Sequence, residues 1–365
     1  MKLKELTDFL ETIAPLSYQE DYDNAGLIVG DPLREISLAL ISLDCVEAVV
    51  DEAIEKGCDV IISHHPIVFR GMKRFNGRSY IERVVMKAIR HDIALYAIHT
   101  NFDNVLEGVN KKICDKIGIK DCTILKPKEG LLKKLVTFCP ASHAEKVREA
   151  LFTAGAGGIG NYSECSFNTE GIGTFTAGEG ADPYAGAIGA RHQEAEVRIE
   201  TIYPANLERR VLTALQQAHP YEEVAYDLYP ISNSYRSVGS GMVGTLEEEA
   251  DEMDFLKRVK RELEASVVRH TALRGKKVKR VAVCGGAGSF LLPFAIGAGA
   301  DVFITADYKY HEFFDADGKV VIADVGHFES EQFTQHLLLE IITKKFPTFA
   351  IHLTENNTNP INYLI

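Results

Sequence analysis

The sequence predicts an α/β fold in which a layered domain is interrupted by an inserted α+β domain. Apolar runs alternate with amphipathic segments over residues 36–104, and the same alternation returns from residue 279 onward. Continuous runs of Ile, Leu and Val are typical of strands covered on both faces, and the intervening helices suit right-handed crossovers. We therefore expect residues 1–127 and 233–365 to be two halves of a single sheet domain, with an insertion at 128–232.

The two halves contain the same kinds of segment in the same order. Short β-branched runs predict strands, and longer runs with apolar residues at helical spacing predict helices. The expected strands include 35–44, 59–62, 93–98, 301–304 and 320–325, and the expected helices include 46–57, 80–92 and 331–346.

The insertion has a different pattern, which reads as β-α-β-β-α-β. Its segments are 131–140, 143–157, 162–178, 195–204, 206–220 and 222–232. This order is the signature of the ferredoxin-like split βαβ fold, which can close on its own as a domain of roughly 100 residues.

Composition excludes several classes of protein. The chain has 365 residues, 46% of them hydrophobic and 25% charged, as in an ordinary globular protein. No apolar run approaches the roughly 18 residues of a membrane span, and the start lacks a secretory signal, so we expect a cytoplasmic protein. Seven scattered cysteines without C-x-x-C spacing indicate reduced thiols. A net charge of −12 makes nucleic acid an unlikely partner and favours a small molecule or a protein.

Clusters of polar residues follow the expected parallel strands of the layered domain. His64 and His65 follow the strand at 59–62, and His99 and Asp103 follow the strand at 93–98. A third cluster, which contains His327 and Glu331, follows the strand at 320–325. The carboxyl ends of strands in an open α/β sheet line one crevice, so we expect these side chains to converge.

The convergent residues predict a metal site. Imidazole and carboxylate ligands together suit Zn, Fe, Mn, Co or Ni better than Ca or Mg. The side chains of His64 and His65 diverge, so they serve two ions about 3.5 to 4 Å apart, bridged by a carboxylate, more easily than one ion. Two alternatives stay open at this point: a single histidine is more often a core or cap residue, and Asp103 can cap the helix that follows it.

Two further polar features lie in the second half. Asp307 and His311 can orient the ligands, act as general acid/base groups, or belong to a surface loop. The loop CGGAGSF at 284–290 can cradle an anion with its backbone N–H groups, but a plain strand-to-helix turn explains it equally well.

The sequence resembles the Nif-three-like family of dinuclear metal-centre proteins, often labelled GTP cyclohydrolase 1 type 2 homologues. The resemblance spans essentially the whole chain. It is carried by EDYDNAGLIVGD at 20–31, ISHHPIVFRGMKR at 62–74, AIHTNFDNVLEGVN at 97–110, VAVCGGAGSF at 281–290, ITADYKYHE at 304–312 and GHFESEQ at 326–332. Tyr22 stands where the family often has Trp.

The resemblance implies a Nif-three-like layered α/β domain with two divalent ions per chain, most often Zn, Fe or Mn. The implied metal ligands are His64, His65, Asp103, His327 and Glu331, with Glu331 bridging the ions and His99 nearby. The insertion resembles the PII/CutA-like domain of the longer bacterial members, through GAGGIGNYSECSF and AHPYEEVAYDLYP. Family members are similar in forming homohexameric rings.

Residues and resemblance together predict a metal-dependent hydrolase. The expected substrate is a small molecule, with GTP suggested by the family label and another nucleotide or phosphoester served equally well by the same metal core. Asp307 or His311 would move protons. The alternative is a non-catalytic metal-binding assembly with a regulatory or interaction role.

Overall fold

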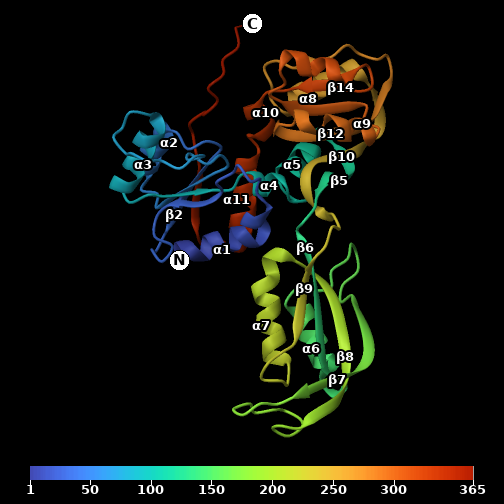
Figure 1. Ribbon diagram of the computed structural model, residues 1–365. Helices are drawn as coiled ribbons and strands as arrows, with labels where there is room; N and C mark the ends of the chain where they lie inside the picture. Colours follow the sequence, from blue (N-terminus) through green and yellow to red (C-terminus); the bar gives the residue numbers. More distant parts are fainter. Residues whose placement is uncertain (365) are drawn as a thin grey trace. The chain divides into compact units, whose positions relative to one another are not determined.

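The computed structural model describes residues 1–364 and divides them into two compact units (Figure 1). The first unit is built from Met1–Pro127 together with the segment that begins at Ser237, and the second unit is Lys128–Arg236. The expected insertion at 128–232 lies within the second unit.

The first unit contains two sheets, so the expectation of one sheet shared by the two halves is wrong. The sequence pattern identifies strands but not their partners, and two strands pair with the opposite half of the chain. Strand β15 (Ala350–Leu353) adds to the N-terminal sheet beside β2 (Leu38–Ser42), and β5 (Ile119–Lys128) adds to the C-terminal sheet beside β10 (Tyr235–Asp251). This exchange of strands ties the halves into one unit.

The N-terminal sheet has the order β1-β4-β3-β2-β15, with β1 antiparallel to β4 and the other pairs parallel. Its core contains Leu40, Ile61 and Leu95, which pack with the apolar faces of α2 and α3. Alternate residues of each strand point to the opposite face of the sheet, so the continuous apolar runs are buried on both sides. The remaining bounds are β1 (Gly26–Val29), β3 (Val60–Ser63), β4 (Ala94–Ala97), α1 (Leu3–Ile13), α2 (Glu47–Lys56), α3 (Tyr80–Arg90) and α11 (Thr334–Lys345).

The C-terminal sheet has the order β11-β14-β13-β12-β10-β5. Its three central strands are parallel, whereas β10 and β11 run antiparallel to their neighbours β12 and β14. The expected strands at 301–304 and 320–325 are confirmed as β13 and β14. The bounds are β11 (Arg269–His270), β12 (Lys277–Ala287), β13 (Val302–Ala306), β14 (Val321–Asp324), α4 (Thr100–Asp103), α5 (Val109–Ile117), α8 (Glu252–Glu262), α9 (Leu292–Gly297) and α10 (His327–Glu331).

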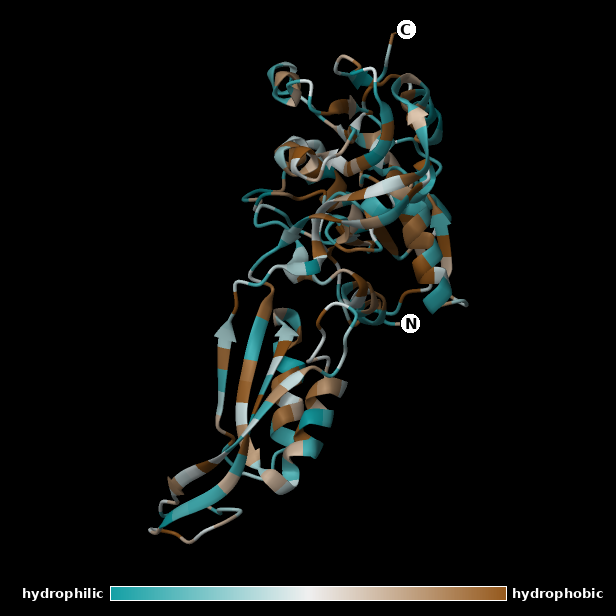
Figure 2. Ribbon diagram, turned by 90° about the vertical axis from the view of Figure 1, so that its right-hand side faces the viewer, coloured by the Kyte–Doolittle hydropathy of each residue, from teal (hydrophilic) through white to brown (hydrophobic). Residues whose placement is uncertain are grey.

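The second unit is a four-stranded antiparallel sheet with two helices along one face, as Figure 2 shows. Its elements follow the order β6-α6-β7-β8-α7-β9, and its strands lie in the order β7-β8-β6-β9. The core between sheet and helices includes Leu135, Val147, Ile199, Val211 and Leu215. The bounds are β6 (Leu132–Pro140), α6 (Ala144–Thr153), β7 (Ser166–Thr176), β8 (Arg191–Pro204), α7 (Glu208–Ala218) and β9 (Tyr226–Pro230).

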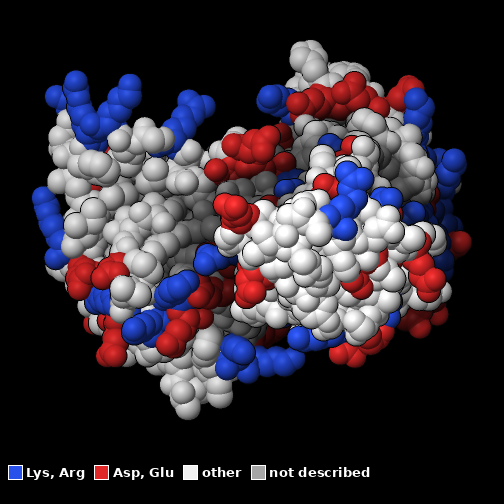
Figure 3. Space-filling model, turned by 60° about the horizontal axis from the view of Figure 1, so that its bottom comes forward, with Lys and Arg blue, Asp and Glu red and all other residues white. Residues whose placement is uncertain are grey.

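Two further features are the distribution of surface charge and the length of the helices. Acidic and basic side chains are interspersed over the face drawn in Figure 3, and neither kind covers it. Among residues 1–364, no helix has the length and apolar character needed to cross a membrane.

The chain enters and leaves the second unit at neighbouring points of the first. A Cβ added at Gly239 would lie only 2.7 Å from the Cα of Pro127. We predict that a protein in which a short Gly/Ser linker replaces Lys128–Arg236 folds and keeps the predicted metal site, because every strand of the first unit remains and only the ends of β5 and β10 are shortened. Circular dichroism with thermal melting and metal analysis check this. Loss of the cooperative transition would contradict it.

Candidate metal centre

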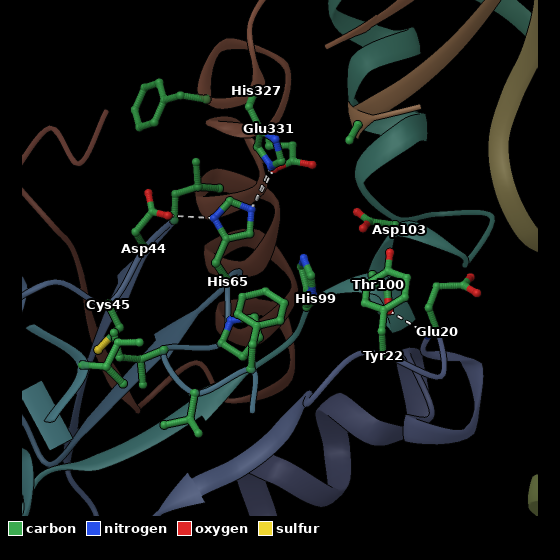
Figure 4. Close-up of a pocket in the computed structure, with 18 of the residues that line it drawn as sticks. Glu20, Tyr22, Asp44, Cys45, His65, His99, Thr100, Asp103, His327 and Glu331 are labelled. Atoms are coloured by element: carbon green, nitrogen blue, oxygen red, sulfur yellow. Dashed lines mark hydrogen bonds and ion pairs between the residues drawn. The ribbon is translucent and has the colours of Figure 1, made fainter. Parts of the chain in front are cut away.

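The polar clusters of the first unit meet at the carboxyl ends of parallel strands. His64 and His65 directly follow β3, and His99 begins the turn between β4 and the short helix α4, which ends at Asp103. His327 and Glu331 lie on α10, four residues apart and therefore on one side of the helix, immediately after β14. Figure 4 shows His65, His99, Asp103, His327 and Glu331 around one cavity.

Glycines in the last residues of β12 make room for the α10 side chains. A Cβ added at Gly286 would lie 2.5 Å from Oε1 of Glu331 and 3.1 Å from Cε1 of His327. Gly286 also has φ of 61°, a conformation that favours glycine. Its N–H donates to Oγ of Ser330. Residues 284–287 of the expected loop at 284–290 therefore belong to β12, and this strand end gives space to two candidate ligands.

Each of the four clustered histidines is held through its Nδ1 atom. Nδ1 of His64 donates to the backbone carbonyl oxygen of Ile98 at 2.8 Å. Carboxylates hold the other three rings at 2.7 Å, in the pairs His65–Asp44, His99–Asp23 and His327–Asp307. A ring fixed at Nδ1 presents Nε2 in one direction, as metal-bound histidines do.

The ligand atoms fall into two groups that share Glu331. Oε2 of Glu331 lies 2.9 Å from Nε2 of His65 and 3.1 Å from Nε2 of His327. The same oxygen lies 3.8 Å from Nε2 of His64, which is 3.6 Å from Oδ1 of Asp103. Ligand atoms bound to one tetrahedral ion by bonds of about 2 Å lie roughly 3.3 Å apart, so each group has suitable dimensions for one ion. His99 forms a third group with His64 and His65.

The group around His64 contains acceptors that face one another without a donor. Burial lowers the pKa of His64 to about 3, so the ring is neutral, and its one proton is on Nδ1. Nε2 therefore carries a lone pair. Nε2 of His64 and Oδ1 of Asp103 are both buried and have no hydrogen-bond partner among the described residues. A cation between them removes this cost, and the residues thus fit a metal ion.

In the group around Glu331 the histidine pKa values are raised, whereas the pKa of His64 is lowered. The charge of Glu331 raises the pKa of His327 to about 11. Burial opposes the charged form of His65, but hydrogen bonds to Asp44 and Glu331 raise its pKa to about 9. Without a metal, protons on both rings neutralise the buried carboxylate of Glu331.

Asp103 is also in an environment that disfavours its negative charge. Burial, and then repulsion from Glu331, raise the pKa of its carboxyl group. Oδ1 has no hydrogen-bond partner among the described residues, so it caps no helix there. The neighbouring Asn101 and Asn104 fix the segment by donating to the carbonyl oxygens of Ala14 and Tyr18.

The structure places the two predicted acid/base residues differently. Asp307 has φ of 57° and holds Nδ1 of His327, which lowers the pKa of its carboxyl group. His311 is exposed, contacts the rings of Tyr310 and Phe314, and does not line the cavity.

Three contributors to the site were missed from the sequence. Asp44 orients His65, and it follows strand β2 directly, so the strand-end argument was sufficient to find it. Asp23 orients His99 and lies within the motif at 20–31. Thr358, whose hydroxyl donates to Oδ2 of Asp44 at 2.6 Å, carries no local signal because it follows the last strand by five residues.

The candidate ligands open into a cavity of about 960 Å³. His65, His99, Asp103, His327 and Glu331 line it together with mainly apolar side chains. An apolar cavity with a few convergent polar groups is the usual form of a small-molecule site.

Comparisons with known proteins agree with this architecture. The profile of the family described as Duf34/NIF3 (NGG1p interacting factor 3) matches residues 1–360. A Bacillus subtilis (strain 168) protein named "GTP cyclohydrolase 1 type 2 homolog" is 38% identical, covering 99% of this chain and 98% of its own. A protein of the same name from Halalkalibacterium halodurans is 41% identical, and the match covers 87% of this chain and 86% of that protein. The crystal structure of a Bacillus cereus "protein related to NIF3" has a TM-score of 0.86 and 39% identity, covering 100% of this chain and 99% of its own.

We predict that Thr358→Val weakens metal binding by about tenfold, because Asp44 loses a donor and holds His65 less firmly. Thr358→Ser keeps the hydroxyl and is the matched control, with affinity close to that of the native chain. Competition with a chelator measures both. Equal affinity in the Val and Ser variants would show that the C-terminal segment does not tune the site.

Metal uptake at pH 7 is predicted to release protons. The raised pKa values of His65 and His327 keep both rings protonated in the metal-free protein, and a metal requires their lone pairs. Affinity should therefore fall as the pH falls. Calorimetry in two buffers of different ionisation enthalpy measures the protons released, with His311→Ala as an unchanged control. Uptake without proton release would refute the assigned protonation.

Proposed function

Since this chain belongs to the Duf34/NIF3 family, we propose that it is a metal-dependent hydrolase with a dinuclear metal site. The observation that carries the proposal is that two buried acceptors, Nε2 of His64 and Oδ1 of Asp103, lie 3.6 Å apart and have no hydrogen-bond partner among the described residues. Such a pair is costly in a folded protein unless a cation binds it.

Two ions per chain would explain why Glu331 belongs to both groups of candidate ligands. His64 and Asp103 would hold one ion, His65 and His327 would hold the other, and Glu331 would bridge them. The mixture of imidazole and carboxylate ligands favours Zn, Fe or Mn. When bound, two such ions supply Lewis-acid chemistry suited to hydrolysis at carbon or phosphorus.

The chain's own residues position the reaction. Asp44 and Asp307 fix His65 and His327, so their Nε2 atoms need no reorganisation during turnover. Of the two predicted proton-transfer residues we retain Asp307, which contacts Nδ1 of the candidate ligand His327, and not His311, which is exposed and lies outside the cavity.

The substrate class follows from the relatives and the cavity. The relatives' name points to GTP, and another nucleotide or a phosphoester would use the same metals. The proposal includes the cytoplasm as compartment, a homohexamer as assembly and no nucleic-acid partner. It also includes a ferredoxin-like, PII/CutA-like identity for the second unit, supported by its order β-α-β-β-α-β and its four-stranded antiparallel sheet.

The alternative is a non-catalytic metal-binding assembly with a regulatory or interaction role. Turnover separates the two functions, because both require the same ligands. In the alternative, loss of the metals lowers thermal stability or assembly but no hydrolysis exists to be lost.

The test combines metal analysis with a substrate screen. Protein purified without chelator or metal-binding tag should contain about two ions per chain and hydrolyse a member of a panel of GTP, other nucleotides and phosphoesters. Glu331→Gln should lower metal content and reduce turnover by about 100-fold or more, while the chain stays folded.

Glu329→Gln provides the matched control. Glu329 lies on the same short helix and is buried, but it bonds to Asn359 and belongs to none of the metal groups. This variant should keep both metal and activity. Metal without turnover on any member of the panel would favour the binding assembly, and no metal after reconstitution with Zn, Fe or Mn would refute both.

A further inference from the structure

The segment 69–78, between β3 and α3, forms part of the wall of the metal-site cavity. Arg70, Lys73 and Arg74 line the cavity together with the candidate metal ligands. All three side chains are exposed, and none makes an ion pair or hydrogen bond with another described residue. These three cations lie within five residues of one another, in a chain whose net charge is −12.

The loop is fixed at its ends and free of hydrogen bonds in its middle. The side-chain amide of Asn24 donates to the carbonyl oxygen of Val68, and the carboxylate of Glu82 accepts from the N–H groups of Asn76 and Arg78. Residues 70–75 make no hydrogen bond with the part of the chain described. The cations are therefore held at the cavity while their side chains stay available to a ligand.

Aromatic rings line the same cavity as these cations and the candidate metal ligands. Phe69 is 46% exposed and packs edge-on against His99, with ring centroids 5.5 Å apart. Tyr22, Tyr80 and Phe290 also line the cavity and are more than half exposed. Exposed aromatic side chains that border a cavity supply flat apolar surface on which a planar ring can stack.

We propose that Arg70, Lys73 and Arg74 bind the phosphate of the substrate while Phe69 contacts its planar ring, so the substrate class is a phosphorylated aromatic compound. Arginine pairs with phosphate oxygens through two parallel hydrogen bonds, which suits two arginines and a lysine on one loop. The inference rests on the proposed function only in that the same cavity holds the reacting end of the ligand. The anion subsite itself is built from residues that bind no metal.

The test measures binding rather than turnover. The probe is (1-naphthylmethyl)phosphonate, which carries a planar ring and an anion but no hydrolysable ester, titrated by calorimetry into the full-length protein as purified. Arg70→Ala/Arg74→Ala should weaken binding about tenfold or more. The matched control is Arg78→Ala/Arg90→Ala, which removes the same charge from exposed positions that do not line the cavity and should change affinity less than about twofold.

A second pair of variants tests the ring contact. Phe69→Ala should weaken binding of the naphthyl probe but not of methylphosphonate, which lacks the ring. Phe75→Ala is the control, because Phe75 lies on the same loop, is 53% exposed and does not line the cavity. If Phe69→Ala and Phe75→Ala affect the naphthyl probe equally, the assignment of the ring contact is wrong.

Metal content measured in every variant separates this inference from the proposed function. A loss of probe affinity in Arg70→Ala/Arg74→Ala with unchanged metal content supports the subsite, whether or not the protein hydrolyses any substrate. Equal affinity in the two double-arginine variants overturns it. Binding that is lost in His64→Ala but unchanged in Arg70→Ala/Arg74→Ala also overturns it, because the metals alone would then hold the anion.

Discussion

The burial of the Glu331 carboxylate against imidazole nitrogens is the interaction on which the rest of the centre depends. The carboxylate faces His65 and His327 directly and His64 slightly further away. These residues come from the ends of β3 and β14, in different sheets, so the charge on one helix draws together the two sheets of the first unit. Buried charge is stable only when it is compensated, either by protons on the rings or by metal ions.

Four hydrogen-bond acceptors fix the orientation of the clustered imidazole rings. Asp44, Asp23, Asp307 and the carbonyl oxygen of Ile98 each hold one Nδ1 atom. These acceptors lie at strand ends or in loops far apart in the sequence, and they convert flexible rings into ligands of fixed direction. The C-terminal segment joins this set through Thr358, so both ends of the chain contribute to the geometry of one centre.

The cavity is lined by side chains of both charges. Carboxylates and imidazoles collect where cations are expected to bind, whereas the unpaired cations of the 69–78 loop stand on the wall. Aromatic rings line the same cavity, and Phe69 contacts His99. In the proposed function, these side chains would orient an anionic molecule with one end at the candidate metal ligands, and such orientation contributes to catalysis.

The sequence by itself determined the α/β character and the residues at the strand ends. His64, His65, His99, Asp103, His327 and Glu331 could be named because each follows a predicted strand, and the family resemblance selected the five ligands without His99. They converge even though β3 and β14 lie in different sheets. Only the tertiary structure decided the pairing of β5 and β15 with the opposite halves, the roles of Asp23 and Thr358, and the need for glycine at Gly286. The reason is physical: periodicity records which face of an element is buried, whereas strand partners, hydrogen-bond directions and close approaches arise between residues distant in sequence.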